Sequence, residues 1–273
     1  MIIRFTGRLN QSGAYTTYSY AFIFFSLPHA IVAVSIFTAL LPGLAGRWTD
    51  RDLPGVRELY SRGMRDTLVV MIPATAGYLV LAGPIVALVA SYGAMGIQDT
   101  DLLARTLAAF AVGLPFFSAF QLLTRTYYAT HDSRTPALTN IVVAVVNLAL
   151  DLWLAFVLDL GVPGLALGYA ASYVAGTAIL WVLLARRLDG ADSRRIGLTV
   201  ARTIGAAACT AAAAWAASAT VAALVDVERP AMRLVQVVAG VAAGVLAFAA
   251  GALIFRIEEA DEVRRALTTR FRR

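Results

Sequence analysis

The stretch RTYYATHDSRTP, residues 125–136, lies between two long apolar runs of the sequence. It brings two arginines, a histidine and an aspartate close together. A charged break between apolar runs is typical of a turn that joins two membrane-spanning helices. The segments around this stretch decide whether it is a site, a loop or a topology signal.

The composition favours a membrane protein. Hydrophobic residues make up 59% of the 273 residues and charged residues 15%, whereas about 25% are charged in an ordinary soluble domain. The single cysteine, Cys209, excludes a disulfide framework, and two well-separated histidines do not form a zinc site. We therefore expect no metal and no other cofactor. The net charge of +6 comes from 23 arginines and no lysine, and their distribution gives no reason to expect a nucleic-acid partner.

Seven apolar runs are long enough to cross a bilayer, which takes about 20 residues per helix. Barrel strands would instead alternate over about ten residues. The sequence therefore predicts an all-α, polytopic membrane helix bundle with seven transmembrane helices. The predicted spans are 18–44, 66–91, 103–127, 137–159, 164–185, 197–224 and 234–255.

The arginines are distributed unevenly among the predicted loops. Most follow the first, third and fifth spans or lie in the C-terminal tail, whereas the loop at 91–101 carries two aspartates and the loop at 160–164 no charge. Cytoplasmic loops are enriched in arginine. We therefore expect a multi-pass protein of the plasma (inner) membrane with a cytoplasmic C-terminus. Arg4 and Arg8 then lie outside, which suggests that the N-terminal context is missing.

This topology makes residues 125–136 a short cytoplasmic turn. Pro136 suits the first turn of the following helix, and Asp132 is suited to capping its start. Tyr128, Asp132 and Arg134 are therefore candidates for a cytoplasmic gate. The alternative is that the arginines only fix the topology, with a contact to Asp132.

Polar residues form one stripe on each helix that flanks this turn. Gln121 and Arg125 lie on the third predicted helix, and Asn140, Asn147 and Asp151 share one face of the fourth. A charged residue at the bilayer centre costs about 2.5–3.5 kcal/mol, so Asp151 is expected to face protein or water. The two stripes suggest a shared polar cavity. Interhelical hydrogen bonds, worth about 0.6 kcal/mol each, are the alternative.

Small residues and prolines give further expectations about packing. Rows of small residues at every fourth position predict closely packed helix faces, and prolines inside spans predict kinks. We expect His29 to be a packed or cavity-facing histidine and not a ligand, and the acidic residues of the tail to lie on a solvated helix. The small-residue rows are Gly164, Gly168, Ser172 and Gly176, and Gly240 and Gly244; the prolines are Pro28, Pro73, Pro84 and Pro115; the acidic residues are Glu258, Glu259, Asp261 and Glu262.

The chain carries no sequence motif of an enzyme. It has no GxSxG, HExxH or phosphate-cradling loop, and no paired carboxylate with a base in register. We therefore expect no catalytic residues.

Several ordered blocks resemble one family of membrane transporters. The opening stretch resembles the signature R-x-F-Y-A-x-x-D-x-[KR]-T-P of the MurJ/MviN family, the lipid II flippases of the MOP exporter superfamily. Further similar blocks are YAFIFFSLPHAIVAVSIFTALLPGLA at 20–45, LAGPIVALVASYGA at 81–94, and Asn147 followed by GVPGLALG at 161–168. The resemblance covers about residues 13–190.

The resemblance implies an architecture. Members of this family have two six-helix lobes around a cavity and two extra helices that help to form a groove for the undecaprenyl tail. This chain would hold the C-terminal half. Residues 1–13 would end a truncated preceding helix or loop, 14–190 would form the second lobe, 191–256 the two extra helices, and 257–273 a charged cytoplasmic tail.

The implied function is to flip lipid II, an undecaprenyl-pyrophosphate-linked precursor, across the membrane by alternating access. The implied partners are lipid II, membrane lipids and a missing N-terminal lobe. One departure is that Phe22 and Ile23 stand where members often carry an Asp-Arg pair, so a cavity cation is absent. Alternatives are a polysaccharide-precursor flippase, a multidrug or cation antiporter of the same superfamily, and a non-transporting membrane scaffold subunit.

Overall fold

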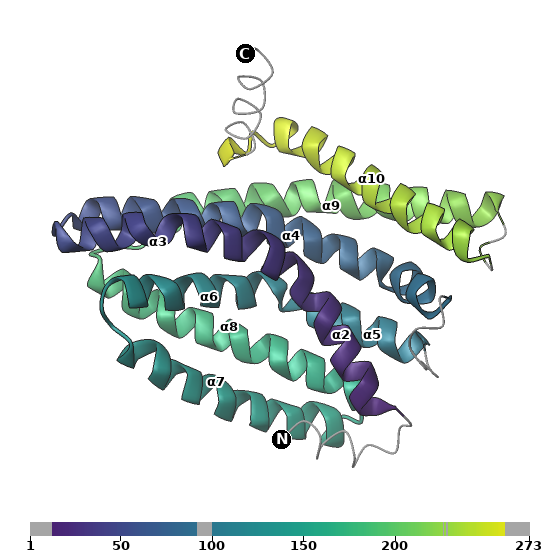
Figure 1. The fold of residues 1–273 in the computed structure, drawn as a ribbon, viewed down its shortest axis with the longest axis horizontal. Helices are drawn as coiled ribbons and strands as arrows, with labels where there is room; N and C mark the ends of the chain where they lie inside the picture. The colour runs from purple at the N-terminus through teal and green to yellow at the C-terminus, as the bar shows by residue number, and fades with distance from the viewer. Residues whose placement is uncertain (1–12, 92–99, 226, 228, 260–273) are drawn as a thin grey trace.

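The computed structural model describes residues 13–91, 100–225, 227 and 229–259, and these residues form helices and turns without any strand (Figure 1). The predicted all-α class is thus confirmed. The elements in chain order are α2 (Ala14–Pro28), the π-helix η1 (His29–Ala33), α3 (Val34–Thr49), α4 (Leu53–Ser91), α5 (Thr100–Val112), α6 (Leu114–Ala129), α7 (Arg134–Leu152), the π-helix η2 (Trp153–Val157), α8 (Gly161–Arg187), α9 (Ser193–Leu224) and α10 (Pro230–Ile254).

Six continuous helical segments in this part of the chain are long and apolar enough to span a membrane. The α5–α6 pair adds a seventh span if it is counted as one bent helix, with a bend of 45°. The bend lies at Gly113, where an added Cβ would sit 2.8 Å from the Cα of Ala170 in α8. Pro115 follows in the first turn of α6. The predicted span at 103–127 is therefore a broken helix pressed against α8.

The helices are longer than the apolar runs that predicted them. The first span extends over Ala14–Thr49 and the second over Leu53–Ser91. The predicted loop at 45–65, between the first two spans, is therefore wrong in extent, because its arginines Arg57, Arg62 and Arg65 lie on the first turns of α4. A hydropathy pattern marks only the apolar part of a helix, which lies in the hydrocarbon core. The helix itself can continue into water, because its backbone hydrogen bonds are internal.

The predicted proline kinks have different outcomes. Pro28 ends α2 and is followed directly by the π-helix η1, and Pro115 follows the bend at Gly113. Pro73 and Pro84 lie inside the uninterrupted helix α4. Each proline removes one backbone hydrogen bond, and α4 remains helical on both sides of Pro73 and of Pro84.

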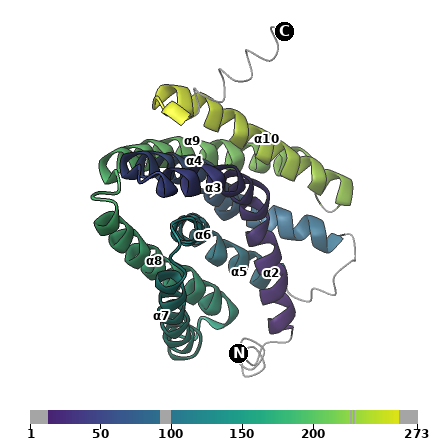
Figure 2. The same cartoon turned by 60° about the vertical axis from the view of Figure 1, so that its left-hand side comes forward.

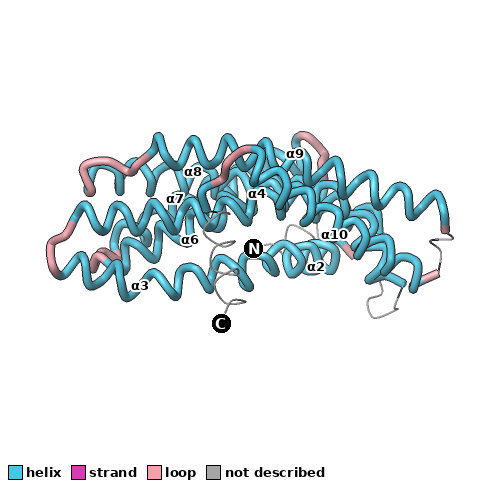
Figure 3. Tube along the Cα trace, turned by 90° about the horizontal axis from the view of Figure 1, so that it is seen from above, coloured by secondary structure: helices cyan, strands magenta, loops and turns pink. Residues whose placement is uncertain are grey.

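The helices pack in two groups that share α4, α5 and α6 (Figures 1 and 2). The α9–α10 hairpin covers α4 on one side, and α7 and α8 pack together on the other. Seen from above, most of the helices lie close to parallel along the long axis (Figure 3). The main core between the groups is rich in aromatic rings, including Phe25, Phe110, Phe117, Tyr169 and Tyr173.

The small residues of α8 form a closely packed face, as predicted. A Cβ added at Gly164 would lie 2.9 Å from the backbone of Leu154, and one at Gly176 would lie 2.4 Å from Val143. Ser172 is fully buried in the same row. These contacts bring α8 against α7 and its extension η2.

Candidate functional site: an apolar groove and three polar clusters

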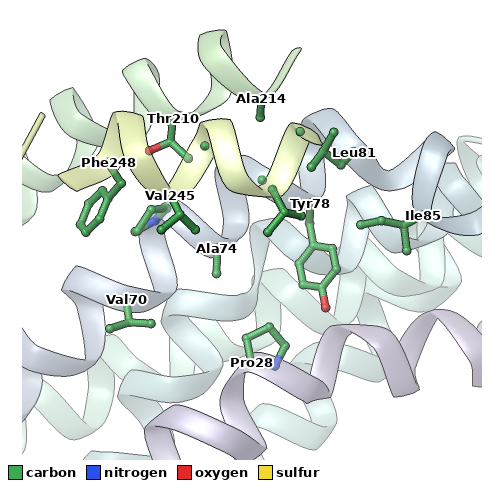
Figure 4. Close-up of a pocket in the computed structure, with 15 residues that line it drawn as sticks. Pro28, Val70, Ala74, Tyr78, Leu81, Ile85, Thr210, Ala214, Val245 and Phe248 are labelled. Atoms are coloured by element: carbon green, nitrogen blue, oxygen red, sulfur yellow. The ribbon is translucent and has the colours of Figure 1, made fainter. Parts of the chain in front are cut away.

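An apolar hollow lies between α4 and the α9–α10 hairpin, with α2 at its edge (Figure 4). Its volume is about 430 Å³. The lining is almost wholly hydrocarbon and includes Pro28, Val70, Tyr78, Leu81, Val245 and Phe248. We call this hollow the groove.

Glycines on both sides produce the groove. A Cβ at Gly240 would lie 2.8 Å from Leu81, and one at Gly244 would lie 3.3 Å from Thr210, so α10 approaches its neighbours closely there. Gly77 of α4 also lines the groove, but it has no atom within 4 Å of an added Cβ. Because glycine has no side chain, Gly240 and Gly244 let α10 approach its neighbours closely, whereas Gly77 leaves open space on α4.

The one tyrosine in the groove is anchored at its polar end. The Tyr78 hydroxyl donates a hydrogen bond of 2.6 Å to the carbonyl of Phe24, which ties α4 to α2. Its ring can therefore line the groove without adding an unpaired polar group. The Gly240–Gly244 pair was predicted as a packing face, and this is confirmed. A groove was expected only because the family resemblance implies one. The glycine at position 77, inside the second predicted span, is the sequence feature that could have indicated its place.

A first polar cluster joins α6 to the π-helix η1. His29 is buried, and its Nδ1 lies 3.0 Å from the Ser118 hydroxyl, so it has the packed one of the two environments that were predicted for it. Arg125 is half-buried, with its guanidinium carbon 5.9 Å from the centroid of the Phe37 ring. Gln121 is half-buried one helical turn before Arg125.

A second polar cluster lies between α7 and α8. Asp151 is 2% exposed and accepts a hydrogen bond of 3.1 Å from the Asn147 side-chain amide. A Cβ added at Gly168 would lie 2.4 Å from a carboxylate oxygen of Asp151. Asp151 therefore faces the protein interior, as predicted. Asn140 is exposed on the same helix.

The structure does not bring the five predicted cavity residues together. Gln121 and Arg125 lie on α6, where Arg125 contacts Phe37 of α3. Asn147 bonds to Asp151, which packs against Gly168 of α8, and Asn140 is exposed. A cavity shared by all five stays a prediction. No group of three histidine, cysteine or acidic residues suited to a metal occurs among the described residues.

A third polar cluster lies in the turn at 130–135. Asp132 accepts hydrogen bonds from the backbone N–H and the hydroxyl of Thr135, so it caps the start of α7 as predicted. The Thr135 backbone N–H is the main cause that lowers the pKa of Asp132 below its ordinary value of 3.8. The side chain that forms an ion pair with Asp132 is that of Arg187 of α8, at 2.9 Å. Arg134 contributes a backbone N–H to Asp132, which also lowers its pKa.

Arg187 makes a second contact with this turn and connects it to α3. It donates a hydrogen bond to the Thr130 carbonyl and lies 4.7 Å from the centroid of the Trp48 ring. The other two predicted gate residues, Tyr128 and Arg134, are exposed. Their role as a gate stays a prediction.

The prediction of a solvated acidic tail is wrong at Glu259. This residue is buried and forms an ion pair with Arg65 of α4, which is buried as well. Glu258 is exposed and pairs with Arg195 at 3.2 Å. No local pattern indicated that Arg65 is the partner of Glu259, because the two residues are 194 positions apart. Asp261 and Glu262 lie outside the described residues.

Comparison with known proteins gives one consistent family. The family model described as "Lipid II flippase MurJ" matches residues 2–236. A probable lipid II flippase MurJ of Rhizobium meliloti is 30% identical over 212 residues, which are 76% of this chain and 39% of that protein. One of Thermotoga maritima is 31% identical over 165 residues, which are 60% of this chain and 33% of that protein.

A solved structure has the same fold. "Lipid II flippase MurJ, inward closed conformation" superposes with a TM-score of 0.67 at 21% identity, covering 90% of this chain and 48% of that chain. The chain therefore spans about half the length of that structure. It spans between 28% and 39% of the three curated relatives from Rickettsia prowazekii, Thermotoga maritima and Rhizobium meliloti.

Proposed function

Because this chain belongs to the lipid II flippase MurJ family, we propose that it provides the second lobe and the tail-binding groove of a flippase for a polyprenyl-pyrophosphate-linked cell-wall precursor. The chain is a multi-pass membrane protein of a transporter family. We propose that it lies in the inner membrane with its C-terminus in the cytoplasm, as the arginine distribution indicates.

The groove is the observation that carries this proposal. A polyprenyl tail has no hydrogen-bonding groups, so its site needs an extended apolar wall and no polar atoms to satisfy. The groove offers about 430 Å³ lined by α2, α4, α9 and α10, and its tyrosine hydroxyl is already bonded to Phe24. The curated relatives carry the name lipid II flippase, whose substrate has such a tail.

For the pyrophosphate head, we propose Arg125 as a cation near the cytoplasmic end. A guanidinium can bind phosphate through two parallel hydrogen bonds, and Arg125 contacts a ring rather than a carboxylate in the described contacts. Gln121, Asn140, Asn147 and Asp151 are proposed to line the polar path of the head. Ile23 supplies no charge, so deeper cations would come from a first lobe, the proposed partner of this chain.

The test of the groove uses a pair of glycines on α4. Gly77 lines the groove and Gly83 does not, and an added Cβ meets no atom within 4 Å at either position. Gly77→Leu would therefore fill the groove without a backbone clash, and Gly83→Leu would add the same side chain elsewhere. Each variant is incubated with a lipid II analogue that carries a photoreactive group in its tail.

We expect Gly77→Leu to reduce crosslinking at least about tenfold, because several methylene groups of the tail would no longer be buried and each contributes about fourfold to the affinity. Gly83→Leu should leave crosslinking unchanged. Equal crosslinking in all three proteins would refute the groove as the tail site. The isolated chain is expected not to flip the analogue in liposomes, because a single lobe leaves its polar path facing lipid.

A further inference from the structure

Two prolines each leave one carbonyl group without its helical donor. In an α-helix the carbonyl of each residue accepts a hydrogen bond from the N–H four residues later, and proline has no N–H. Pro28, at the end of α2, therefore leaves the Phe24 carbonyl without this donor. Pro115, in the first turn of α6, does the same to the Ala111 carbonyl. Both carbonyls lie in segments that are apolar enough to span a membrane, where an unpaired polar group is costly.

A tyrosine of α4 supplies the donor at the first break. The Tyr78 hydroxyl donates a hydrogen bond of 2.6 Å to the Phe24 carbonyl, the one that Pro28 leaves open. Its side chain extends from α4 toward Pro28 (Figure 4). The π-helix η1 begins at the next residue, His29. A side chain from another helix thus replaces the missing backbone donor at the point where the first span is interrupted.

A threonine one turn earlier on α4 has the same role at the second break. The Thr75 hydroxyl lies 3.0 Å from the Ala111 carbonyl and 3.0 Å from the carbonyl of Met71, on its own helix. A hydroxyl has one proton to donate, so Thr75 shares it between the two acceptors. The span that receives this contact bends by 45° between α5 and α6. Neighbouring hydroxyls of α4 therefore reach two different broken spans.

The two broken spans also contact each other just beyond their breaks. His29 directly follows Pro28, and its Nδ1 lies 3.0 Å from the hydroxyl of Ser118, three residues after Pro115. Both side chains are buried. The first span, the α5–α6 pair and α4 are therefore connected pairwise at the two breaks. We call these three contacts the joint; they are Tyr78–Phe24, Thr75–Ala111 and His29–Ser118.

We infer that Thr75 and Tyr78 are positioning residues, whose hydroxyls take the place of the two backbone donors that the prolines lack and so fix the bends of both broken spans on α4. Pro28 and Tyr78 both line the groove, so the Tyr78 bond also holds the α2 edge of the groove against α4. What the groove binds rests on the proposed function, whereas the two bonds to α4 do not depend on any ligand.

The test pairs each hydroxyl with its proline in a double-mutant cycle. Tyr78→Phe removes only the hydroxyl, and Pro28→Ala restores a backbone N–H for the Phe24 carbonyl. Tyr78→Phe should lower the midpoint of thermal unfolding of the full chain in detergent by about 3–8 °C, because a carbonyl in apolar surroundings loses its partner. In the Pro28→Ala background the same change should have at most about half of this effect, since the backbone then supplies the donor.

The second cycle combines Thr75→Val with Pro115→Ala, and the same pattern is expected with a smaller drop, because Thr75 divides its proton between two carbonyls. The crossed combinations are the matched controls. Tyr78→Phe should keep its full effect in the Pro115→Ala background, and Thr75→Val should keep its own in the Pro28→Ala background. Full effects in the paired backgrounds would overturn the inference. Equal losses in the paired and the crossed backgrounds would overturn the assignment of one hydroxyl to each proline.

A distance measurement separates positioning from a general loss of stability. The exposed Cys209 is first replaced by alanine. Spin labels are then attached to cysteines at Tyr15 and Ala39, which are exposed on the two sides of the first break. Double electron–electron resonance gives the distribution of distances between the two labels.

Tyr78→Phe should broaden this distribution, and Thr75→Val should leave it unchanged, because Thr75 contacts the other broken span. Adding Pro28→Ala to the Tyr78→Phe chain should narrow the distribution again. An unchanged distribution in a folded Tyr78→Phe chain would overturn the positioning role, even if that chain were less stable. Failure of Gly77→Leu to reduce tail crosslinking would instead refute the groove as the tail site and leave the joint unaffected.

Discussion

The seam between α7 and α8 and the seam between α4 and the α9–α10 hairpin share two features: a row of small residues and an arginine–carboxylate pair at one end. In the first seam the row closes the interface, because a Cβ added at Gly164, Gly168 or Gly176 would lie within 3 Å of an atom of the facing helix. In the second, Gly240 and Gly244 also allow close contact, yet a groove of about 430 Å³ remains beside them.

The difference comes from the partner helix. Opposite α8, the side chains of Leu154, Asp151 and Val143 or their backbone fill the space that the glycines leave. Opposite α10, the helix α4 presents Pro73, Ala74 and Gly77 to the groove, which are too small to fill it. In these two seams, the row of small residues closes the interface where the facing helix comes into contact with it, and leaves a groove where small residues of α4 face it.

The terminal ion pairs differ in burial. Arg65 and Glu259 have side-chain exposures of 8% and 7%, whereas Arg187 and Asp132 have 29% and 24%. Breaking a buried pair leaves an uncompensated charge away from water, whereas a partly exposed pair is screened. The two seams should therefore respond very differently to loss of the carboxylate.

The largest effect is expected for Glu259→Ala. It leaves the buried Arg65 with only the exposed Glu258, at 4.0 Å, in place of its close partner. This should lower the free energy of unfolding by about 3 kcal/mol, the lower end of the range for a broken buried pair. The double variant Arg65→Met/Glu259→Leu should regain most of that loss, because it removes both charges. Thermal unfolding in detergent, followed by circular dichroism, measures both. A double variant no more stable than Glu259→Ala would show that the two residues do not act as a pair.

A smaller loss is expected for Gly168→Leu in the closed seam. Its side chain would meet Asp151 and the backbone of α7, and overpacking of this kind costs about 1–3 kcal/mol. Gly83→Leu provides the control, because an added Cβ there meets no atom within 4 Å. If both variants unfold at the same temperature, the α7–α8 seam is looser than the contacts of Gly168 indicate.

These two seams also separate what the sequence predicts from what it does not. Hydropathy and the four-residue spacing of Gly164, Gly168 and Gly176 predict the helices and the closed seam, because both depend on local pattern. The groove depends on which residues of α4 lie opposite α10, and the pairing of Arg65 with Glu259 joins positions far apart in the sequence. Such contacts follow from the tertiary arrangement, and no local pattern encodes them.

The same reasoning applies to the polar residues. The stripe on the fourth predicted helix correctly placed Asp151 inside the protein, since exposure of a carboxylate to lipid is costly. It did not predict that Asp151 would pack toward Gly168 while Arg125 contacts Phe37 on another helix pair. Periodicity fixes the face of a helix but not the neighbour that the face meets.

Gly77→Ala tests the seam between α4 and the α9–α10 hairpin, and here we expect a small gain in stability instead of a loss. Alanine has a higher helix propensity than glycine by about 0.8–1.0 kcal/mol, and the added methyl group meets nothing within 4 Å. The variant should therefore unfold at a slightly higher temperature. Gly244→Ala is the comparison in the same seam, because its Cβ would lie 3.3 Å from Thr210 and offset part of the gain. Destabilisation by Gly77→Ala would mean that the groove is filled at that position.

The smallest effect concerns the partly exposed pair of Asp132 and Arg187, at one end of the α7–α8 seam. The pKa of Asp132 is lowered from 3.8, first by the Thr135 backbone N–H, with a further contribution from the Arg187 guanidinium. A carboxyl group with a depressed pKa in the folded state stabilises the protein above its ordinary pKa, and this contribution is lost as the pH falls through the lowered value.

Asp132→Asn should therefore unfold at a slightly lower temperature than the unaltered chain at neutral pH, and the gap should close as the pH falls below 3.8. Thermal unfolding across that range provides the measurement, with Asp189→Asn, in the turn that follows α8, as the control. A gap that persists unchanged well below 3.8 would show that Asp132 acts through the shape of the turn and not through its charge.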